Sequence, residues 1–349
     1  MRKSFIAILI SFVILSTGWG QTTNSGSQSP VDLEAKKAFN QAVAAIGAKQ
    51  YSQAIVSLNK VLELNPDFIS AYNERGKVFL QSGKLKEANL DFEQVIKLDK
   101  ELGEAYFGRG YITFLSKNYE LAFKDFSTAI SNGYNEYPVY YYRGMINLIR
   151  NDANAAILDF TFSVDKNPNF AEAYHDRGSA KFKLKDYPGA LADYERAIQN
   201  KPNFALAYSN SGSVKKELGD FQGAIQAFTK SLELDSNLLV SWNNRGVVRF
   251  FSGDIVGAKA DFDKALLLNN NYLLAVNNLA IVEAKMEKYT SAAENLNKAV
   301  KMDNTRGELF INRGYVKEQL GDLDGACKDW HIADTLKIKQ AQLYLKDCK

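Results

Sequence analysis

The sequence predicts an all-α fold built from consecutive helix-turn-helix units. Three periodic positions carry this prediction. An alanine recurs every 34 residues, a glycine or alanine lies 12 residues before it, and a large apolar residue lies four residues after it. A fixed period of this length is typical of repeat architectures, in which each unit packs on its neighbours. The periodic alanines stand at positions 54, 88, 122, 156, 190, 224, 258, 292 and 326.

The spacing within each unit indicates two helices that pack closely. In the second unit, Tyr72 and Gly76 are four residues apart and therefore share one face of a first helix. Ala88, Phe92 and Val95 form an apolar stripe on a second helix. We expect the small residues to let the two helices approach and the aromatic residues to fill the remaining space.

Turn residues separate the two predicted helices of a unit. Examples are "SGD" at 252–254 and "LGD" at 320–322. A glycine at this place is expected to end the first helix in a left-handed conformation. Prolines at 66, 168 and 202 fall at the ends of units, where a helix must stop.

This 34-residue pattern resembles the tetratricopeptide repeat (TPR). Residues 35–334 read as nine consecutive repeats without insertions, although repeats 1 and 8 lack the glycine. The resemblance implies a right-handed superhelical solenoid of nine helix-turn-helix units, whose first helices line a concave groove. Solenoids need polar caps, and residues 335–349 are expected to form a capping helix. Its inward-facing residues are expected to be Leu336, Ile338, Ala341 and Leu345.

The first 20 residues have the pattern of a secretory signal peptide. Arg2 and Lys3 precede an apolar run that is shorter than the ~20 residues needed to span a bilayer. We expect cleavage after Gly20, with cleavage after Gly18 or an uncleaved membrane anchor as alternatives. Residues 21–34 are then a flexible linker. The mature chain is expected to have no transmembrane span and to be periplasmic or secreted.

Composition argues against nucleic-acid binding and against catalysis. The formal net charge is only +3, whereas nucleic-acid binders usually carry a strong basic excess. The two histidines and two cysteines form no cluster with metal-ligand spacing. We therefore expect no enzyme activity, no metal and no cofactor. Cys327 and Cys348 either form a disulfide that holds the cap in an oxidising compartment or remain two free thiols.

An arginine and an aspartate occur together in six of the nine repeats. Counting from the first residue of each repeat (69 in repeat 2), the arginine is at position 7 and the aspartate at position 23. Paired variation of this kind indicates spatial contact, and arginine suits a two-pronged bond to a carboxylate. We interpret the pairs as structural, rather than the arginines as ligand-binding. They are Arg75–Asp91, Arg109–Asp125, Arg143–Asp159, Arg177–Asp193, Arg245–Asp261 and Arg313–Asp329.

Asparagines form the first of two candidate binding surfaces. The resemblance implies that positions 2, 5, 6, 9, 12 and 13 face the groove. An amide offers both a donor and an acceptor and so complements a peptide bond. The arrangement is similar to the asparagine ladder of the TPR part of O-linked GlcNAc transferase, although asparagine is also an ordinary residue on an exposed face. The residues are Asn210, Asn244, Asn278 and Asn312 at position 6, with Asn243 and Asn277 at position 5.

The second candidate surface is an aromatic patch in repeats 3 to 5. A contiguous exposed patch of this kind marks an interaction site. The alternative is that packing of the superhelix buries these side chains. The residues are Phe107, Tyr111, Phe114, Tyr141, Tyr142, Met145 and His175.

These features together predict a non-catalytic scaffold or adaptor that binds a protein or an extended peptide in the groove. One alternative is a binder of envelope glycan or lipid-bearing components that uses the aromatic patch. A second alternative is a structural solenoid that assembles with itself.

Overall fold

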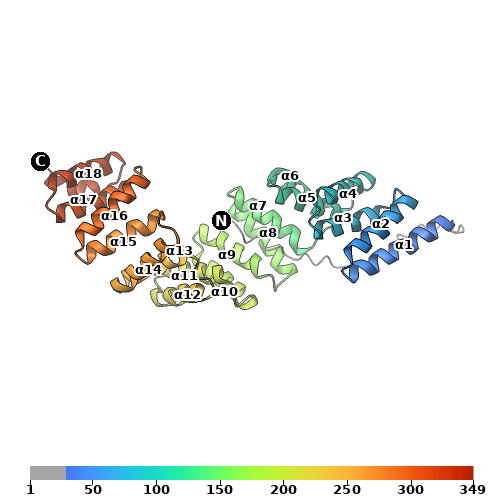
Figure 1. Ribbon diagram of the computed structural model, residues 1–349, viewed down its shortest axis with the longest axis horizontal. Helices are drawn as coiled ribbons and strands as arrows, with labels where there is room; N and C mark the ends of the chain where they lie inside the picture. The colour runs from blue at the N-terminus through green and yellow to red at the C-terminus, as the bar shows by residue number, and fades with distance from the viewer. Residues whose placement is uncertain (1–28, 349) are drawn as a thin grey trace. The chain divides into compact units, whose positions relative to one another are not determined.

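The computed structural model describes residues 29–348, which are helices joined by short turns, with no strand in this range (Figure 1). The predicted all-α fold of consecutive helix pairs is confirmed. The chain divides into two compact units, Met1–Ala173 and Tyr174–Lys349. The proposed signal peptide, residues 1–20, lies outside the described residues.

The helices of the first unit follow one another as pairs. Within a pair such as α3 and α4, the two helices pack along their length, and α4 also packs against α5 of the next pair. The helices are α1 (Pro30–Gly47), α2 (Tyr51–Leu64), α3 (Ile69–Gln81), α4 (Leu85–Leu98), α5 (Gly103–Leu115), α6 (Tyr119–Ser131), α7 (Tyr137–Ile149) and α8 (Ala153–Lys166).

The second unit continues the same arrangement. Helix α9 (Ala171–Lys183) contains the boundary between the units. First helices of successive repeats also touch, α13 with α15 and α15 with α17. The remaining elements are α10 (Tyr187–Asn200), α11 (Ala205–Glu217), α12 (Phe221–Leu234), α13 (Leu239–Phe251), α14 (Ile255–Leu268), α15 (Leu273–Lys285), α16 (Tyr289–Met302), α17 (Gly307–Gln319), α18 (Leu323–Thr335), α19 (Ala341–Tyr344) and the 3-10 helix η1 (Leu345–Asp347).

The periodic glycine is where the two helices of a repeat approach most closely. A Cβ atom added to Gly246 would lie 2.7 Å from a ring carbon of Phe262, which is buried. Repeats 1 and 8 have alanine at this position, and there the facing residue is a leucine, as Leu296 faces Ala280. The smaller side chain on the second helix explains why those two repeats tolerate a methyl group.

Replacing Gly246 with alanine is expected to lower the free energy of unfolding by about 1–2 kcal/mol, because overpacking outweighs the better helix propensity of alanine. In a Phe262→Leu background, the same substitution is expected to be neutral or stabilising. Urea unfolding of the four proteins measures both effects. An equal loss in the two backgrounds would show that the ring does not exclude the methyl group.

The turn glycines end the first helices as predicted. Gly253 and Gly321 have φ angles of 86° and 84°, a left-handed conformation that a residue without Cβ adopts at no steric cost. The same turn position in repeats 3 and 5 is taken by Lys117 and Lys185, with φ angles of 62° and 63°. The turn geometry is therefore fixed by the repeat and does not require glycine.

The linker expected over residues 21–34 is helical from Pro30 onward. Ser29 caps α1 by accepting a hydrogen bond from the backbone N–H of Asp32, and the Asp32 side chain accepts from the Ser29 backbone. This reciprocal capping box satisfies two donors of the first turn. Pro30 adds the fixed φ angle that suits a first helical position. Together these residues start the helix ahead of the first repeat.

The capping helix expected over residues 335–349 is wrong in its extent. The segment is a turn followed by the four-residue α19 and by η1. Lys337 has a φ angle of 64°, which interrupts a continuous helix. The predicted inward side is nevertheless found, because Ala341 is fully buried and Leu336, Ile338 and Leu345 pack against the same core as Trp330.

Candidate functional site

The predicted asparagines lie along the first helices of the second unit and bond to one another. Asn312 donates to Asn277 at 2.9 Å, and Asn278 donates to Asn243 at 3.0 Å. Within a repeat, Asn277 donates to Asn278 at 3.5 Å and Asn243 to Asn244 at 3.2 Å. The five amides form one hydrogen-bonded series, which we call the amide chain.

The amide chain follows from the offset between stacked first helices. A position-6 amide contacts position 5 of the preceding repeat, 35 residues earlier in the chain. Asn210 has the same relation to His175, whose Nε2 lies 2.9 Å from its amide nitrogen. The sequence pattern placed these asparagines on one surface but did not predict that they bond to one another. Their mutual hydrogen bonds leave each amide only part of its hydrogen-bonding capacity for a ligand.

A cavity of about 310 Å³ lies beside the amide chain. Ile281 and Tyr315 line it at position 9 of repeats 8 and 9, and Asn312 of the amide chain lines it as well. Gln340 and Tyr344 of the C-terminal cap also line it. Tyr315 is 40% exposed, so the cavity opens beside an accessible aromatic ring. We call the amide chain and this cavity together the first-helix site.

The sequence did not predict this cavity. Its walls come from α13, α15, α16 and α17 and from the cap, and only the stacking of the repeats brings them together. The signal that was available is the pair of large apolar side chains, Ile281 and Tyr315, at a position expected to face the groove.

The prediction of an exposed aromatic patch in repeats 3 to 5 is wrong. Phe107, Phe114, Tyr141 and Tyr142 are buried, whereas Tyr111 and Met145 are half-buried. Phe107 stacks on Tyr134, with ring centroids 4.9 Å apart. The ring of Tyr142 packs against those of Tyr111 and Phe114 at 4.9 and 5.2 Å. These rings form a core between successive helices instead of a surface.

The His175 side chain is held by contacts within the protein. Its Nδ1 lies 2.8 Å from the Asp176 carboxylate, and its ring packs 4.9 Å from that of Phe204. With Asn210 on its other nitrogen, both ring nitrogens have protein partners. The residue therefore links repeats 5 and 6 within the second unit.

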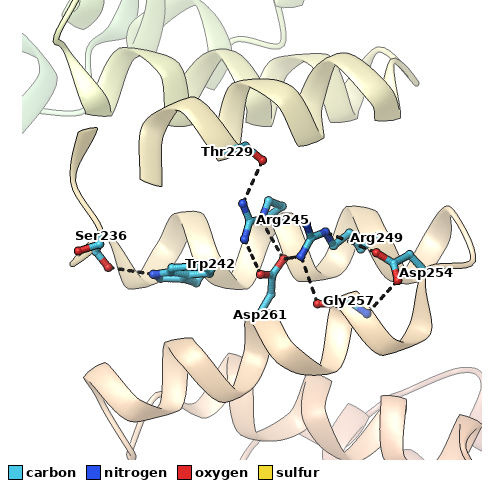
Figure 2. A network of polar contacts seen from close by, with 8 residues as sticks. All are labelled: Thr229, Ser236, Trp242, Arg245, Arg249, Asp254, Gly257 and Asp261. Atoms are coloured by element: carbon cyan, nitrogen blue, oxygen red, sulfur yellow. Dashed lines mark hydrogen bonds and ion pairs between the residues drawn. The ribbon is translucent and has the colours of Figure 1, made fainter. Parts of the chain in front are cut away.

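The structure places all six predicted arginine–aspartate pairs in contact. Figure 2 shows the pair in repeat 7, where Arg245 donates two hydrogen bonds to Asp261, at 2.9 and 2.7 Å. The third nitrogen of the guanidinium donates to Thr229 of the preceding repeat at 3.0 Å. The guanidinium also lies 4.8 Å from the ring centroid of Trp242. Arg245 thus holds together the two helices of its repeat and the repeat before it.

The other five pairs repeat this geometry. In each, the guanidinium donates two or more hydrogen bonds to the aspartate carboxylate, and the aspartate is buried. Each arginine also lies over the aromatic ring three residues before it. The carboxylate contacts are those of Arg75, Arg109, Arg143, Arg177 and Arg313.

Several aspartates have a second partner, at position 11 of the repeat, that was not predicted from the sequence. Lys181 pairs with Asp193 and Lys317 with Asp329, each at 2.8 Å. In repeat 7 Arg249 donates to Asp261 at 2.9 Å (Figure 2). Position 11 lies four residues after the arginine, on the same helix face, so the i, i+4 spacing was the available signal.

At two of the aspartates, burial shifts the carboxyl pKa more than the ion pair does. Burial raises the pKa of Asp91 and of Asp159, although hydrogen bonds from Arg75 and Arg143 act to lower it. A carboxyl group with a raised pKa in the folded state contributes stability below its unfolded pKa, and this is lost as the pH rises through the folded pKa. The ion pairs therefore compensate the charges of buried groups, and they do not add large net stability at neutral pH.

A cluster of charged and polar side chains lies on α3 and α5, the first helices of repeats 2 and 3. Lys77 pairs with Glu74 at 2.6 Å and with Glu104 at 3.2 Å. Burial raises the pKa of Glu74. Burial acts to lower the pKa of Lys77, but the two carboxylates outweigh it and the net shift is upward. The Asn73 amide donates to Glu104, while its buried oxygen has no hydrogen-bond partner.

Cys327 and Cys348 are joined by a disulfide. The bond connects α18 to Cys348, directly after η1, and closes a separation of 21 residues. Tyr344 stacks on Trp330 beside it, with ring centroids 5.0 Å apart. Because Tyr344 lines the cavity, the disulfide holds one wall of the first-helix site.

The described residues contain no candidate metal site and no candidate membrane span. Within residues 29–348, no three or more histidine, cysteine, aspartate or glutamate side chains are grouped so that they could hold a metal ion. None of the helices in this range is both long enough and apolar enough to cross a bilayer.

Family models identify the repeats. Models described as TPR repeat or tetratricopeptide repeat match residues 48–83, 73–136, 171–204 and 205–238. The chain belongs to the tetratricopeptide repeat family. A search of curated proteins finds no match to the sequence.

Solved structures with the same fold are distant in sequence. The crystal structure of the APC/C hetero-tetramer Cut9–Hcn1 matches with a TM-score of 0.55 and 13% identity, covering 92% of this chain and 96% of that one. PilF of Pseudomonas aeruginosa matches with a TM-score of 0.54 and 17% identity, over 60% of this chain and 95% of that one. The C-terminal part of a TPR protein from Cytophaga hutchinsonii gives 0.54 and 17%, over 69% and 98%. At these identities the likeness concerns the fold alone.

The fold suggests a general class of function. TPR proteins bind proteins or peptides and are generally non-catalytic scaffolds. The fold of this chain therefore suggests a scaffold for protein–protein interaction.

Proposed function

We propose that the chain is a scaffold that binds an extended peptide segment of a partner protein at the first-helix site. The observation that carries this proposal is the cavity of about 310 Å³ beside the amide chain. A cavity of this size accepts one apolar side chain, and burying such a side chain contributes about 1.5–3 kcal/mol. The neighbouring amides supply donors and acceptors for the peptide backbone.

The ligand chemistry follows from the two halves of the site. Ile281 and Tyr315 offer apolar surface, so the peptide should present a leucine, methionine or aromatic residue to the cavity. The amide chain runs from Asn312 to Asn244, so the flanking backbone should be extended along it. Because the amides already bond to one another, they would contribute orientation more than affinity.

Peptides selected from a random phage-displayed library on the whole chain test this proposal. Replacing Ile281 with aspartate or Tyr315 with alanine is expected to weaken their binding at least about tenfold, as for a central contact of an interface. The control is Leu267→Asp on α14, because Leu267 is 78% exposed and does not line the cavity. Peptides whose affinity is unchanged by Ile281→Asp, or reduced as much by Leu267→Asp, would contradict this placement.

We also propose that the protein is exported and that residues 1–20 are removed. The Cys327–Cys348 disulfide supports this proposal, because disulfides persist mainly in oxidising compartments. The mass of the mature protein tests it: the expected chain begins at Gln21, and a chain that retains Met1 would contradict cleavage.

The glycan alternative loses the feature on which it depended. It required an exposed aromatic patch in repeats 3 to 5, and most of those rings are buried. No described feature favours self-assembly of the chain, so we retain peptide binding as the proposed function.

A further inference from the structure

A second cavity, of about 440 Å³, lies between α10, α11 and α12 and outside the first-helix site. Its walls include Tyr208, Ser211 and Lys215 from α11 and Ala227 from α12. Glu195 of α10 also lines it. All of these residues belong to the second unit.

This cavity is the space left by a missing ion pair. Ser211 and Ala227 occupy positions 7 and 23 of repeat 6, where repeat 7 has Arg245 and Asp261 in contact. The remaining wall residues also correspond. Tyr208 matches the aromatic ring under the arginine, and Glu195 matches Thr229, which accepts from the third nitrogen of the guanidinium.

Lys215 lies at the position from which a cation pairs with the aspartate in other repeats, but repeat 6 has no aspartate at position 23. It occupies position 11, where Lys181 and Lys317 pair with their aspartates at 2.8 Å. Within the described part of the chain, Lys215 forms no ion pair. Its ammonium group can therefore reach the volume in front of Ala227 that an aspartate carboxylate fills in repeats 5, 7 and 9.

The two other repeats that lack the arginine–aspartate pair, repeats 1 and 8, do not have an unpaired cation at position 11. Repeat 8 has Glu283 at position 11, and Glu283 is bonded to Asn295 at 2.8 Å. Repeat 1 has Ala45 there, which is buried. Among the nine repeats described, only repeat 6 combines a cation at position 11 with an aliphatic residue at position 23.

We propose that this cavity binds the carboxylate of an acidic side chain supplied by a peptide. The carboxylate takes the place of the missing aspartate, pairs with Lys215 and contacts the Ser211 hydroxyl. Glu195 faces the half of the cavity that a guanidinium donor fills in other repeats, so it is available to a peptide N–H next to the acidic side chain. This site is independent of the proposed peptide site on the first helices.

The probe for this proposal is the α-methylamide of N-acetyl-L-glutamate, which carries a single side-chain carboxylate. Titration into the whole chain labelled with ¹³C at alanine methyl groups is followed at the Ala227 methyl. We expect a saturable shift of that signal. The neutral glutamine analogue is expected to bind at least about tenfold more weakly, because hydrogen bonds to a charged group are the stronger ones.

Two variants separate the proposed contacts from general effects. Lys215→Met is expected to lower the affinity at least about tenfold, whereas Lys216→Met is expected to leave it unchanged, because Lys216 pairs with Glu217. Ser211→Arg combined with Ala227→Asp restores the ion pair and should abolish binding by filling the cavity. Absence of a saturable shift, equal binding of the glutamine analogue, or undiminished affinity in Lys215→Met would overturn the proposal.

Discussion

Replacing Asp261 with asparagine is expected to lower the free energy of unfolding by about 3–5 kcal/mol. The Asp261 side chain is buried and receives hydrogen bonds from both Arg245 and Arg249. Asparagine keeps the shape but removes the charge, which leaves the guanidinium of Arg245 buried without a counterion. Loss of one partner from a buried pair costs this much because the other charge remains uncompensated.

Urea unfolding measures this loss, and a neighbouring residue provides the control. Asp263 lies on the same helix, is 49% exposed on its side chain and pairs with Lys259 at 2.8 Å. Its replacement by asparagine is expected to cost about 0–1 kcal/mol, as for exposed pairs. A double-mutant cycle with Arg245→Ala and Asp261→Ala should give a coupling of at least about 2 kcal/mol. Additive effects within about 0.5 kcal/mol would contradict a structural role of the pair.

Loss of the Cys327–Cys348 disulfide is the second large expected effect. For a separation of 21 residues, the chain-entropy model gives about 3 kcal/mol of stabilisation. Replacing both cysteines with alanine should therefore lower the stability of the second unit by about that amount. The loss should be concentrated at α18 and the cap, where Tyr344 stacks on Trp330.

Reduction of the protein provides the matched experiment. Dithiothreitol should lower the urea midpoint of the wild-type chain and leave that of the double-alanine variant unchanged. Two thiols that react in the denatured wild-type protein without reductant would show that the bond is absent in solution. Reduction is also expected to weaken peptide binding, because Gln340 and Tyr344 line the cavity.

The 34-residue period was sufficient to predict the helix pairs, because each periodic residue has a fixed place in the contact between two helices. Gly246 and Phe262 illustrate this, as do Ala280 and Leu296. The boundaries were less predictable at the two ends. The capping box of Ser29 starts α1 before the repeats begin, and the left-handed Lys337 ends the regular helix after them. Neither feature belongs to the repeating pattern.

The candidate site was predicted only in part. Joint occurrence of arginine and aspartate identified contacts inside a repeat, because both residues are present or absent together. Contacts between repeats depend on how first helices are offset when they stack, which explains why the amide chain was not expected. Burial of Phe107 and Tyr142 was missed for the same reason, since neighbouring helices cover positions that the pattern assigned to a groove.

The most direct test of the proposed peptide site is photo-crosslinking from defined positions. A photoreactive phenylalanine analogue is placed at Tyr315, beside the cavity, or at Leu267, on the exposed surface of α14. The account predicts that a selected peptide crosslinks to the protein from position 315 and not from position 267. Crosslinking from position 267, or none from position 315 while the peptide remains bound, would contradict a binding site on the first helices.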